Sequence, residues 1–343
     1  MRRGRIVIRT DADPAIGIGH VGRTLALAEA WRQLGGKVHY VASAPLAPSA
    51  DAWIRTAGIP LDVLDTARYS DADAAATAAI AGHAPVVLDA FGTPHAYRTV
   101  LRDLVPRLAI IDDMGGGGPW SADIILNQNY GASPSYYPGQ DPGTGLLLGP
   151  RYALLRPEFL RWRARPRRRD GQARRIAVSL GGTDPANITS LVLDALDHKA
   201  AAGWKALVVA GAANPRAAEL KARAKTGSKI HVIRRPSSMA RLLVWADVAI
   251  LAGGVTVWEA LALGVPSVGI AVAENQVQAA EALDRDGLWR YLGQASAVDI
   301  HRIGEAVKNL LADTGARRRL SETGQALVDG QGAARFADAL ARL

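Results

Sequence analysis

Two glycines and a histidine mark the place in this chain where a short apolar strand gives way to a helix. Gly17 and Gly19 follow the apolar run at 6–8, and His20 comes directly after Gly19. Glycine lets a ligand approach the backbone closely, and the first N–H groups of a helix attract an anion. Imidazole exchanges a proton near neutral pH. The pattern therefore predicts a proton-transferring histidine beside an anion site.

A second glycine turn, Gly253-Gly254, also follows an apolar strand and opens a helix. Such a turn suits a diphosphate, and Glu259, one helical turn further on, could accept hydrogen bonds from ribose hydroxyls. A tight turn followed by a capping acid would give the same pattern. Residues 181–184 form a similar turn. The predicted nucleotide-binding residues are Gly181, Gly182, Thr183, Gly253, Gly254, Val255, Thr256 and Glu259.

Two other motifs are weaker. Residues 17–22 match G-x-G-x-x-G, but residues 10–16 separate the motif from its strand, and the second strand does not end in the acid that a dinucleotide ribose needs. Asp11 and Asp13 form an Asp-x-Asp pair that recurs at 71–73, inside an expected helix. None of the seven histidines lies at ligand spacing from another. We predict no metal site and no cofactor.

Composition places the chain among globular proteins. With 343 residues it is long enough for two domains, and 49% hydrophobic and 21% charged residues are ordinary proportions. Cysteine is absent, which is compatible with the cytoplasm and excludes a cysteine nucleophile. We expect no signal peptide, and no apolar run approaches the roughly 20 residues of a membrane-spanning helix. The preference for arginine over lysine suggests a bacterial source with a GC-rich genome.

The positive charge is local. Residues 161–175 contain eight arginines and one aspartate, so this run supplies most of the net charge of +9. A basic run of this kind is usually a solvated linker, and we expect no nucleic-acid binding. A polyanionic partner for the run stays open.

Strand and helix signals alternate along the whole chain, which indicates parallel sheets covered by helices. The pattern restarts after the basic run, so we predict two similar α/β domains facing across a cleft: 1–160, a linker at 161–175, and 176–343. Because ligands collect where parallel strands end, Asp11 and Asp89 are candidate site residues. The glycine run at 115–118 is expected to be a flexible loop. The predicted strands are 5–8, 38–42, 85–89, 108–112, 124–126, 175–180, 205–210, 229–233, 248–251 and 267–271.

Several segments, taken in order, resemble the UDP-sugar hydrolases of pseudaminic acid biosynthesis. The resemblance begins at Arg9-Thr10-Asp11 and at the segment 16–23, which includes His20 and Arg23. It extends over nearly the whole chain. The other similar segments are 111–113, 123–129, 148–159, 178–184 with Asn187, 252–259, 264–266, Asn275-Gln276 and 329–333.

The resemblance implies a glycosyltransferase-B type fold, two Rossmann-like domains with the active site between them. It implies that the C-terminal domain holds UDP through the turns at 253–259 and 181–184. It implies that His20 is the catalytic residue, with Asp11 orienting it or binding the sugar. The same architecture serves the lipid II-forming N-acetylglucosaminyltransferase. The residues expected on the sugar or substrate side are Gly17, Gly19, Arg23, Asp89, Asn187, Asn275 and Gln276.

The leading hypothesis is therefore a metal-independent nucleotide-sugar hydrolase that cleaves at the anomeric carbon with inversion, using His20 as the base. The alternative is an inverting glycosyltransferase acting on a small-molecule acceptor, such as a natural product. A non-catalytic binder of nucleotide-sugars or polyanions is a third possibility. Differences from the family at Gly22, Ala90, 115–118 and 161–175 leave the sugar, the acceptor and the nucleotide base open.

Overall fold

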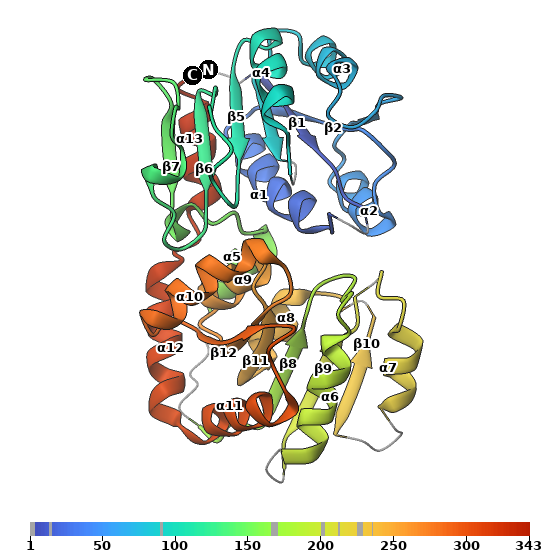
Figure 1. Cartoon of the computed structure of the whole chain (residues 1–343), viewed down its shortest axis with the longest axis vertical. Helices are drawn as coiled ribbons and strands as arrows, with labels where there is room; N and C mark the ends of the chain where they lie inside the picture. Colours follow the sequence, from blue (N-terminus) through green and yellow to red (C-terminus); the bar gives the residue numbers. More distant parts are fainter. Residues whose placement is uncertain are drawn as a thin grey trace. The chain divides into compact units, whose positions relative to one another are not determined.

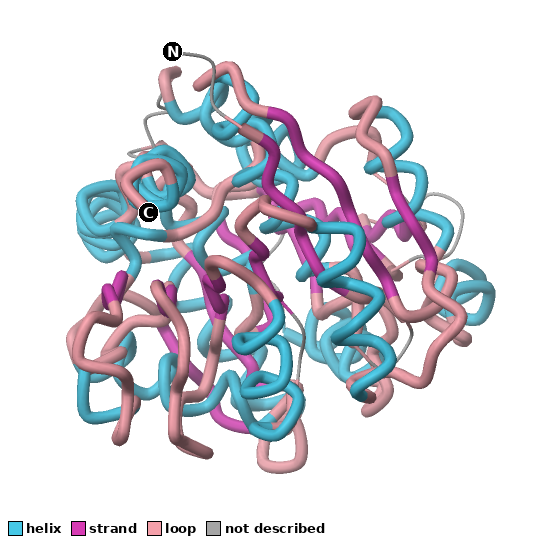
Figure 2. Tube along the Cα trace, turned by 90° about the horizontal axis from the view of Figure 1, so that it is seen from above, coloured by secondary structure: helices cyan, strands magenta, loops and turns pink. Residues whose placement is uncertain are grey.

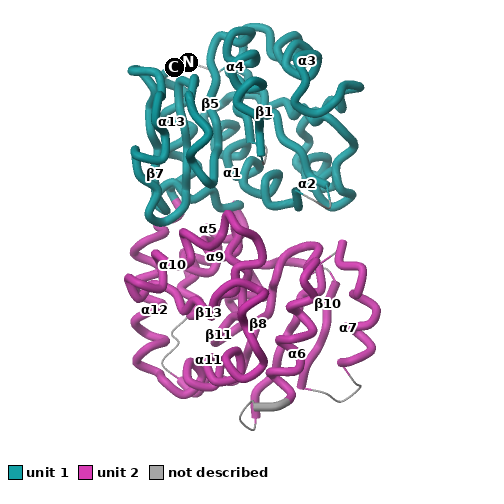
Figure 3. Tube along the Cα trace, in the orientation of Figure 1, with its two compact units in different colours: residues 1–156, 331–343 teal, residues 157–330 magenta. Residues whose placement is uncertain are grey.

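The computed structural model describes residues 4–13, 16–89, 92–165, 171–199, 203–211, 213–224, 229–234 and 236–343. The chain divides into two compact units, coloured separately in Figure 3. Unit 1 comprises residues 1–156 and 331–343, and unit 2 comprises residues 157–330. The last 13 residues, which the sequence pattern groups with the second domain, thus belong to the first unit.

The described residues of unit 1 form a seven-stranded parallel sheet in the order β3-β2-β1-β4-β5-β6-β7 (Figure 1). β1 lies near the middle and is buried on both faces, which is why its sequence is a continuous apolar run. The strands are β1 (Arg5–Thr10), β2 (Lys37–Ala42), β3 (Leu61–Val63), β4 (Val86–Asp89), β5 (Leu108–Ile111), β6 (Ile124–Asn127) and β7 (Gly145–Leu148).

Helices cover both faces of this sheet (Figure 2). On one face Ile6 and Ile8 of β1 share a core with Leu27 and Trp31 of α1. On the other face Val7 packs in a second core, with side chains from α3 and α4. The helical elements of unit 1 are α1 (Gly19–Gln33), α2 (Pro48–Thr56), α3 (Asp71–Ala81), α4 (His95–Leu104), the short 3₁₀ helices η1 (Pro134–Tyr136) and η2 (Pro150–Tyr152), and α13 (Gly332–Leu340).

The C-terminal helix α13 is an integral part of the first core. Phe336 is fully buried in it, together with Leu27 and Trp31. The helix starts in tight contact with the residues just after η2. A Cβ at Gly332 would lie 2.3 Å from the carbonyl oxygen of Ala153. Only glycine fits there, so the start of α13 is fixed against η2.

The described residues of unit 2 form a six-stranded parallel sheet in the order β10-β9-β8-β11-β12-β13. Its strands are β8 (Arg175–Ser179), β9 (Lys205–Val209), β10 (Ile230–Ile233), β11 (Val248–Ala252), β12 (Ser267–Ala271) and β13 (Arg290–Gln294). Its helical elements are α5 (Pro157–Arg163), α6 (Ile188–Lys199), α7 (Ala217–Arg223), α8 (Met239–Trp245), α9 (Val255–Ala262), the 3₁₀ helix η3 (Glu274–Gln276), α10 (Val277–Arg285), α11 (Ile300–Ala312) and α12 (Thr314–Leu327).

Both sheets contain the strand order of a Rossmann fold, 3-2-1-4-5-6 in the numbering of each unit, and β7 extends the sheet of unit 1 beyond β6. The strand order reverses between β1 and β4 in unit 1, and between β8 and β11 in unit 2. Ligands of open α/β sheets bind beyond the carboxyl ends of the strands at such a point. The predicted fold class, two Rossmann-like α/β domains, is confirmed, and the loops that follow these four strands are the places to look for a site.

Two segments differ from expectation. The glycine run at 115–118 is not a loose loop, because hydrogen bonds fasten it to the rest of unit 1. The Gly116 amide donates to the Tyr136 carbonyl at 2.7 Å, and the Trp120 indole donates to the Gly116 carbonyl at 2.8 Å. Gly115, Gly116 and Gly117 all have positive φ, which is the physical reason for glycine in this run.

The basic run is ordered at both of its described ends. Arg163, in α5, donates to the carbonyls of Gln325 and Val328, so it satisfies the C-terminal end of α12. The amides of Arg174 and Arg175 donate to Asp247. Residues 166–170, in the middle of the expected linker, lie outside the described part of the chain.

Candidate functional site

The loop between β1 and α1 is shaped by Asp13. Its carboxylate accepts a hydrogen bond from the Ile16 amide at 2.8 Å, and its carbonyl accepts one from the Gly17 amide at 2.7 Å. Gly17 has a φ of 81°, a value that favours glycine. The chain then enters α1 at Gly19, so His20 stands in the first turn of the helix. The predicted turn from loop to helix is present.

His20 meets a carboxylate from the neighbouring strand β4. Its Nδ1 lies 2.8 Å from Oδ1 of Asp89, the last residue of β4. Asp89 is fully buried, whereas 11% of the His20 side chain is exposed. The contact forms because β1 and β4 are parallel neighbours with Thr10 opposite Asp89, so the loop after β1 and the end of β4 meet at the same edge.

Arg23, one turn after His20 in α1, holds the same carboxylate with two nitrogens. Its Nε donates to Oδ2 of Asp89 at 2.8 Å, and its Nη2 donates to Oδ1 at 2.6 Å. The third nitrogen, Nη1, donates to Asp113 in the loop after β5 at 2.7 Å. Asp89 and Arg23 form a hydrogen-bonded ion pair that contacts the histidine, and their expected role on the substrate side stays a prediction.

The charge on Asp89 fixes the tautomer of His20. Burial favours the neutral acid, but the charges of Arg23 and His20 and their hydrogen bonds outweigh burial and lower the pKa of Asp89 to about 2. An ionised carboxylate only accepts hydrogen bonds, so Nδ1 of His20 must carry the proton that it shares with Asp89. In the neutral ring the lone pair is then on Nε2. This is the arrangement of a general base oriented by a carboxylate.

Asp11 lies in a different cluster. One of its oxygens accepts from Nη1 of Arg9 at 2.8 Å, and the other accepts from the amide and hydroxyl of Ser43 at 2.8 and 3.0 Å. Arg9 in turn binds both oxygens of Asp73 in α3. The sequence left two roles open for Asp11, orienting His20 or binding the sugar. The residue that contacts Nδ1 of His20 is Asp89. Asp13 pairs with Arg68 at 2.5 Å, so both carboxylates of the Asp-x-Asp motif meet arginines.

Asp113 is the site residue that sequence reasoning missed. It lies in 111–113, one of the segments that carry the family resemblance, and its contact with Arg23 bridges 90 positions in the sequence. It is the second residue after β5, a buried strand two places from β1 in the sheet, and this position is the signal that could have drawn attention to it. The Asp113 carbonyl also accepts from the Asn129 side chain at 2.8 Å, which ties this loop to the loop after β6.

In unit 2 the turn after β11 is braced by a glutamine. Oε1 of Gln276, in η3, accepts from the amides of Gly253 and Val272 at 3.1 and 2.9 Å. A Cβ at Gly253 would lie 2.8 Å from the Gln276 side chain, so glycine is required for this packing. Gln276 was expected near the sugar; it joins the ends of β11 and β12, and its role towards a sugar stays a prediction.

Helix α9 starts directly after this turn. Gly254 is its first flanking residue, and within the described structure no side chain caps the helix. The first N–H groups of a helix have no partner within it, so this end retains the donors and the partial positive charge that suit a diphosphate. Val255 and Thr256 form its first turn. Glu259, one turn further on, is 4% exposed, and Asn275 precedes Gln276 in η3.

The other glycine turn is built differently. Gly181-Gly182 follows β8, the neighbour of β11, so the two turns emerge at the same edge of the sheet. The helix behind it, α6, is already capped: the Asp184 carboxylate accepts from the amides of Ile188 and Thr189 at 2.8 and 2.9 Å. An anion is not favoured at that helix end. The side-chain oxygen of Asn187 accepts from the Ser190 hydroxyl at 2.8 Å, which is a local contact.

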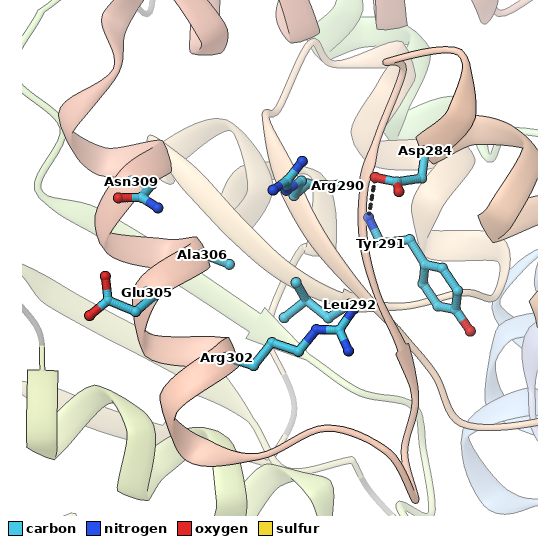
Figure 4. Close-up of a pocket in the computed structure, with 8 residues that line it drawn as sticks. All are labelled: Asp284, Arg290, Tyr291, Leu292, Arg302, Glu305, Ala306 and Asn309. Carbon is cyan, nitrogen blue, oxygen red and sulfur yellow. Dashed lines mark hydrogen bonds between the residues drawn. The ribbon is translucent and has the colours of Figure 1, made fainter.

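A cavity of about 320 Å³ lies elsewhere in unit 2, between β13 and α11 (Figure 4). Arg290 and Leu292 point towards α11, whereas Tyr291 points to the other side of the strand, as alternation along a strand requires. None of the predicted site residues lines it. The remaining lining residues are Asp284, Arg302, Glu305, Ala306 and Asn309.

Two kinds of feature are absent from the described residues. They contain no group of three or more His, Asp or Glu side chains arranged to hold a metal ion. They also contain no helix with the length and apolar character of a membrane span.

Known proteins resemble both units. Residues 176–339 match the model of the glycosyltransferase family 28 C-terminal domain. The spore coat polysaccharide biosynthesis protein SpsG of Bacillus subtilis (strain 168) is 27% identical over 251 residues, which cover 72% of this chain and 73% of SpsG.

Solved structures resemble the whole chain at low identity. MurG of Acinetobacter baumannii has a TM-score of 0.70 at 16% identity, covering 99% of this chain and 100% of MurG. The spinosyn rhamnosyltransferase SpnG, solved with thymidine diphosphate, has a TM-score of 0.61 at 18% identity, covering 98% of this chain and 99% of SpnG. This chain therefore has the GT-B fold, and its second half matches a glycosyltransferase family 28 C-terminal domain.

Proposed function

We propose that this protein is an inverting glycosyltransferase that moves a sugar from a nucleoside diphosphate to an acceptor hydroxyl. The observation that carries the proposal is the contact of His20 with the buried, ionised Asp89, because it prepares a histidine to accept a proton. The family 28 match of residues 176–339 and the thymidine diphosphate in SpnG support a nucleotide-sugar donor.

These comparisons favour transfer over the hydrolysis that the sequence resemblance implied. Transfer was the alternative in the sequence analysis, and the two reactions differ only in whether an acceptor hydroxyl or water attacks. We therefore treat hydrolysis as an outcome of the test below.

In the proposed reaction Nε2 of His20 takes the proton of the acceptor hydroxyl. The oxygen attacks the anomeric carbon, and the bond from that carbon to the diphosphate oxygen breaks with its electron pair. Attack from the face opposite the leaving group inverts the anomeric configuration. The imidazolium that forms is stabilised by Asp89, which lies 2.8 Å from Nδ1.

The departing diphosphate gains negative charge, and uncapped helix N–H groups stabilise such charge. In unit 2 the start of α9, at Gly254 and Val255, offers these groups. Glu259 remains the proposed partner of the ribose hydroxyls. Because Asp184 already caps α6, the second turn contributes through the backbone of Gly181 and Gly182.

The test uses His20→Asn, since the asparagine side chain can still donate to Asp89 but does not take a proton. Release of nucleoside diphosphate from UDP- and TDP-sugars is followed with and without candidate acceptor alcohols. We expect release only with acceptor, and a 10²–10⁴-fold lower rate in the variant, with UDP or TDP binding retained. His95→Asn, an exposed histidine on α4, is the matched control and should keep full activity.

Two results would contradict the proposal. Release that does not need an acceptor, and that is lost in His20→Asn, identifies a hydrolase. Near-normal transfer by His20→Asn shows that His20 is not the base.

A further inference from the structure

We propose that Arg23 and Asp113 are positioning residues for His20: Arg23 locks Asp89 onto Nδ1, and Asp113 offsets the positive charge that Arg23 brings close to the ring. The inference rests on the proposed role of His20 as the base. It adds two residues that act through Asp89 and not on the substrate.

The locking follows from the contacts. Both oxygens of Asp89 are held by Arg23, at 2.8 and 2.6 Å, so the carboxylate plane is fixed by a bidentate pair. Oδ1 is also the atom that faces Nδ1 of His20. Because Arg23 is only 2% exposed and Asp89 is fully buried, water does not screen the pair. A carboxylate held in this way fixes both the ring orientation and its tautomer.

Arg23 alone would oppose catalysis. Its Nη2 lies 3.2 Å from Nδ1 of His20, and a cation at that distance disfavours a second positive charge on the ring. Asp113, bound to Nη1 at 2.7 Å, supplies a compensating negative charge. With Asp89, Arg23 and Asp113 all ionised, the cluster carries −1 when His20 is neutral and becomes neutral when the imidazole takes a proton. Asp113 therefore offsets the positive charge that Arg23 places beside the imidazole.

The other ionisable groups on neighbouring strands contribute less. Asp11 and Arg9 of the β1 end form an ion pair with each other. Tyr40 of β2 is buried and donates to the Thr24 hydroxyl; burial, reinforced by the charge of Asp89, raises its pKa, so it stays neutral. Asp89 and Arg23 thus contact the His20 ring directly, and Asp113 acts on it through Arg23.

The experiment is a pH titration of His20 by NMR in the unliganded full-length protein with ¹⁵N-labelled histidine, assigned by its loss in His20→Asn. Asp113→Asn removes a negative charge and should shift the His20 titration to lower pH. Arg23→Gln removes a positive charge and should shift it to higher pH, and it should also raise the fraction of the Nε2–H tautomer. Opposite shifts of a few tenths of a pH unit or more are expected.

Asp123→Asn is the matched control. This aspartate also pairs with arginines in unit 1, at 3.4 and 3.2 Å from Arg102 and Arg107, but it precedes β6 at the opposite end of the strands. Its loss should leave the His20 titration unchanged. If Arg23→Gln does not fold, Asp113→Asn decides alone, because Asp113 is partly exposed and its removal leaves the Arg23–Asp89 pair intact.

Shifts in the same direction, or no shift in Asp113→Asn, would overturn the inference and leave Arg23 and Asp113 as purely structural ties between α1 and the β5 loop. The titration needs no substrate and is independent of the transfer assay. It can contradict the roles of Arg23 and Asp113 even if the transfer assay shows that His20 is the base. If both hold, the acidic limb of the pH–rate profile should move with the His20 titration in each variant.

Discussion

Asp89 is the residue on which the polar cluster of unit 1 depends. It is a buried carboxylate that shares its two oxygens between His20 and Arg23. Removing one partner of a buried ion pair is costly, because the remaining charge is left in a poorly solvating environment. The stability of unit 1 should therefore respond to the ionisation of this one group.

This residue predicts a pH dependence of folding. The pKa of Asp89 falls from 3.8 in a free carboxyl to about 2 in the fold, so its stabilisation is fully present above pH 4 and is lost as the pH falls through 2. The shift corresponds to about 2 kcal/mol. We expect Asp89→Asn to be less stable than the native protein at pH 7 by at least that order, measured by denaturant unfolding.

The same measurement at low pH is the internal control. Protonated aspartate resembles asparagine, so the stability gap between the two proteins should narrow between pH 4 and pH 2. A gap that stays constant over this range would show that Asp89 is not ionised in the fold at neutral pH.

At the scale of elements, the turn after β11 depends on a side chain from the next strand's loop. Gln276 accepts from the part-buried amides of both Gly253 and Val272, and a typical intramolecular hydrogen bond contributes about 0.5–1.5 kcal/mol to stability. The shape of the turn, and with it the direction of the α9 N–H groups, should follow from this brace.

We therefore expect Gln276→Ala to weaken UDP binding by about tenfold, equivalent to roughly 1.4 kcal/mol, measured by isothermal titration calorimetry. Gln294→Ala, at an exposed glutamine of β13 in the same unit, should bind UDP normally. Unchanged affinity in Gln276→Ala would mean that the brace supports the fold without shaping the nucleotide site.

At the scale of the whole molecule, the chain leaves unit 1 and returns to it with its last helix. Phe336 of α13 and Phe159 of α5 are both fully buried phenylalanines, one in each unit. Replacing a buried phenylalanine by alanine costs about 3–5 kcal/mol. The two substitutions therefore form a matched pair that reports on different units.

Phe336→Ala should destabilise unit 1, although it lies near the C-terminus, and Phe159→Ala should destabilise unit 2. Hydrogen exchange followed by mass spectrometry distinguishes them: faster exchange is expected in α1 and β1 for the first variant and in β8 and β11 for the second. Faster exchange of β8 and β11 in Phe336→Ala would place α13 with the second unit.

The sequence by itself determined the sheets. Central parallel strands are buried on both faces, so they appear as apolar runs such as 5–8 and 248–251, and helical periodicity lies between them. The strands that escaped prediction, β3, β7 and β13, end the two sheets. Their burial is incomplete; β3 and β13 carry no continuous apolar run, whereas β7 has only three leucines between two glycines.

The glycine turns, and His20 beside one of them, were visible in the sequence. Glycine is required at Gly17 by its positive φ and favoured at Gly253 by close packing, so both turns carry a sequence signal. Only the tertiary structure decided the partners: Asp89 and not Asp11 for His20, Asp113 for Arg23, and unit 1 for α13. The physical reason is that parallel strands place their carboxyl ends together in sheet order, not in sequence order. Contacts across 69 or 90 positions are set by that order and leave no periodic trace in the chain.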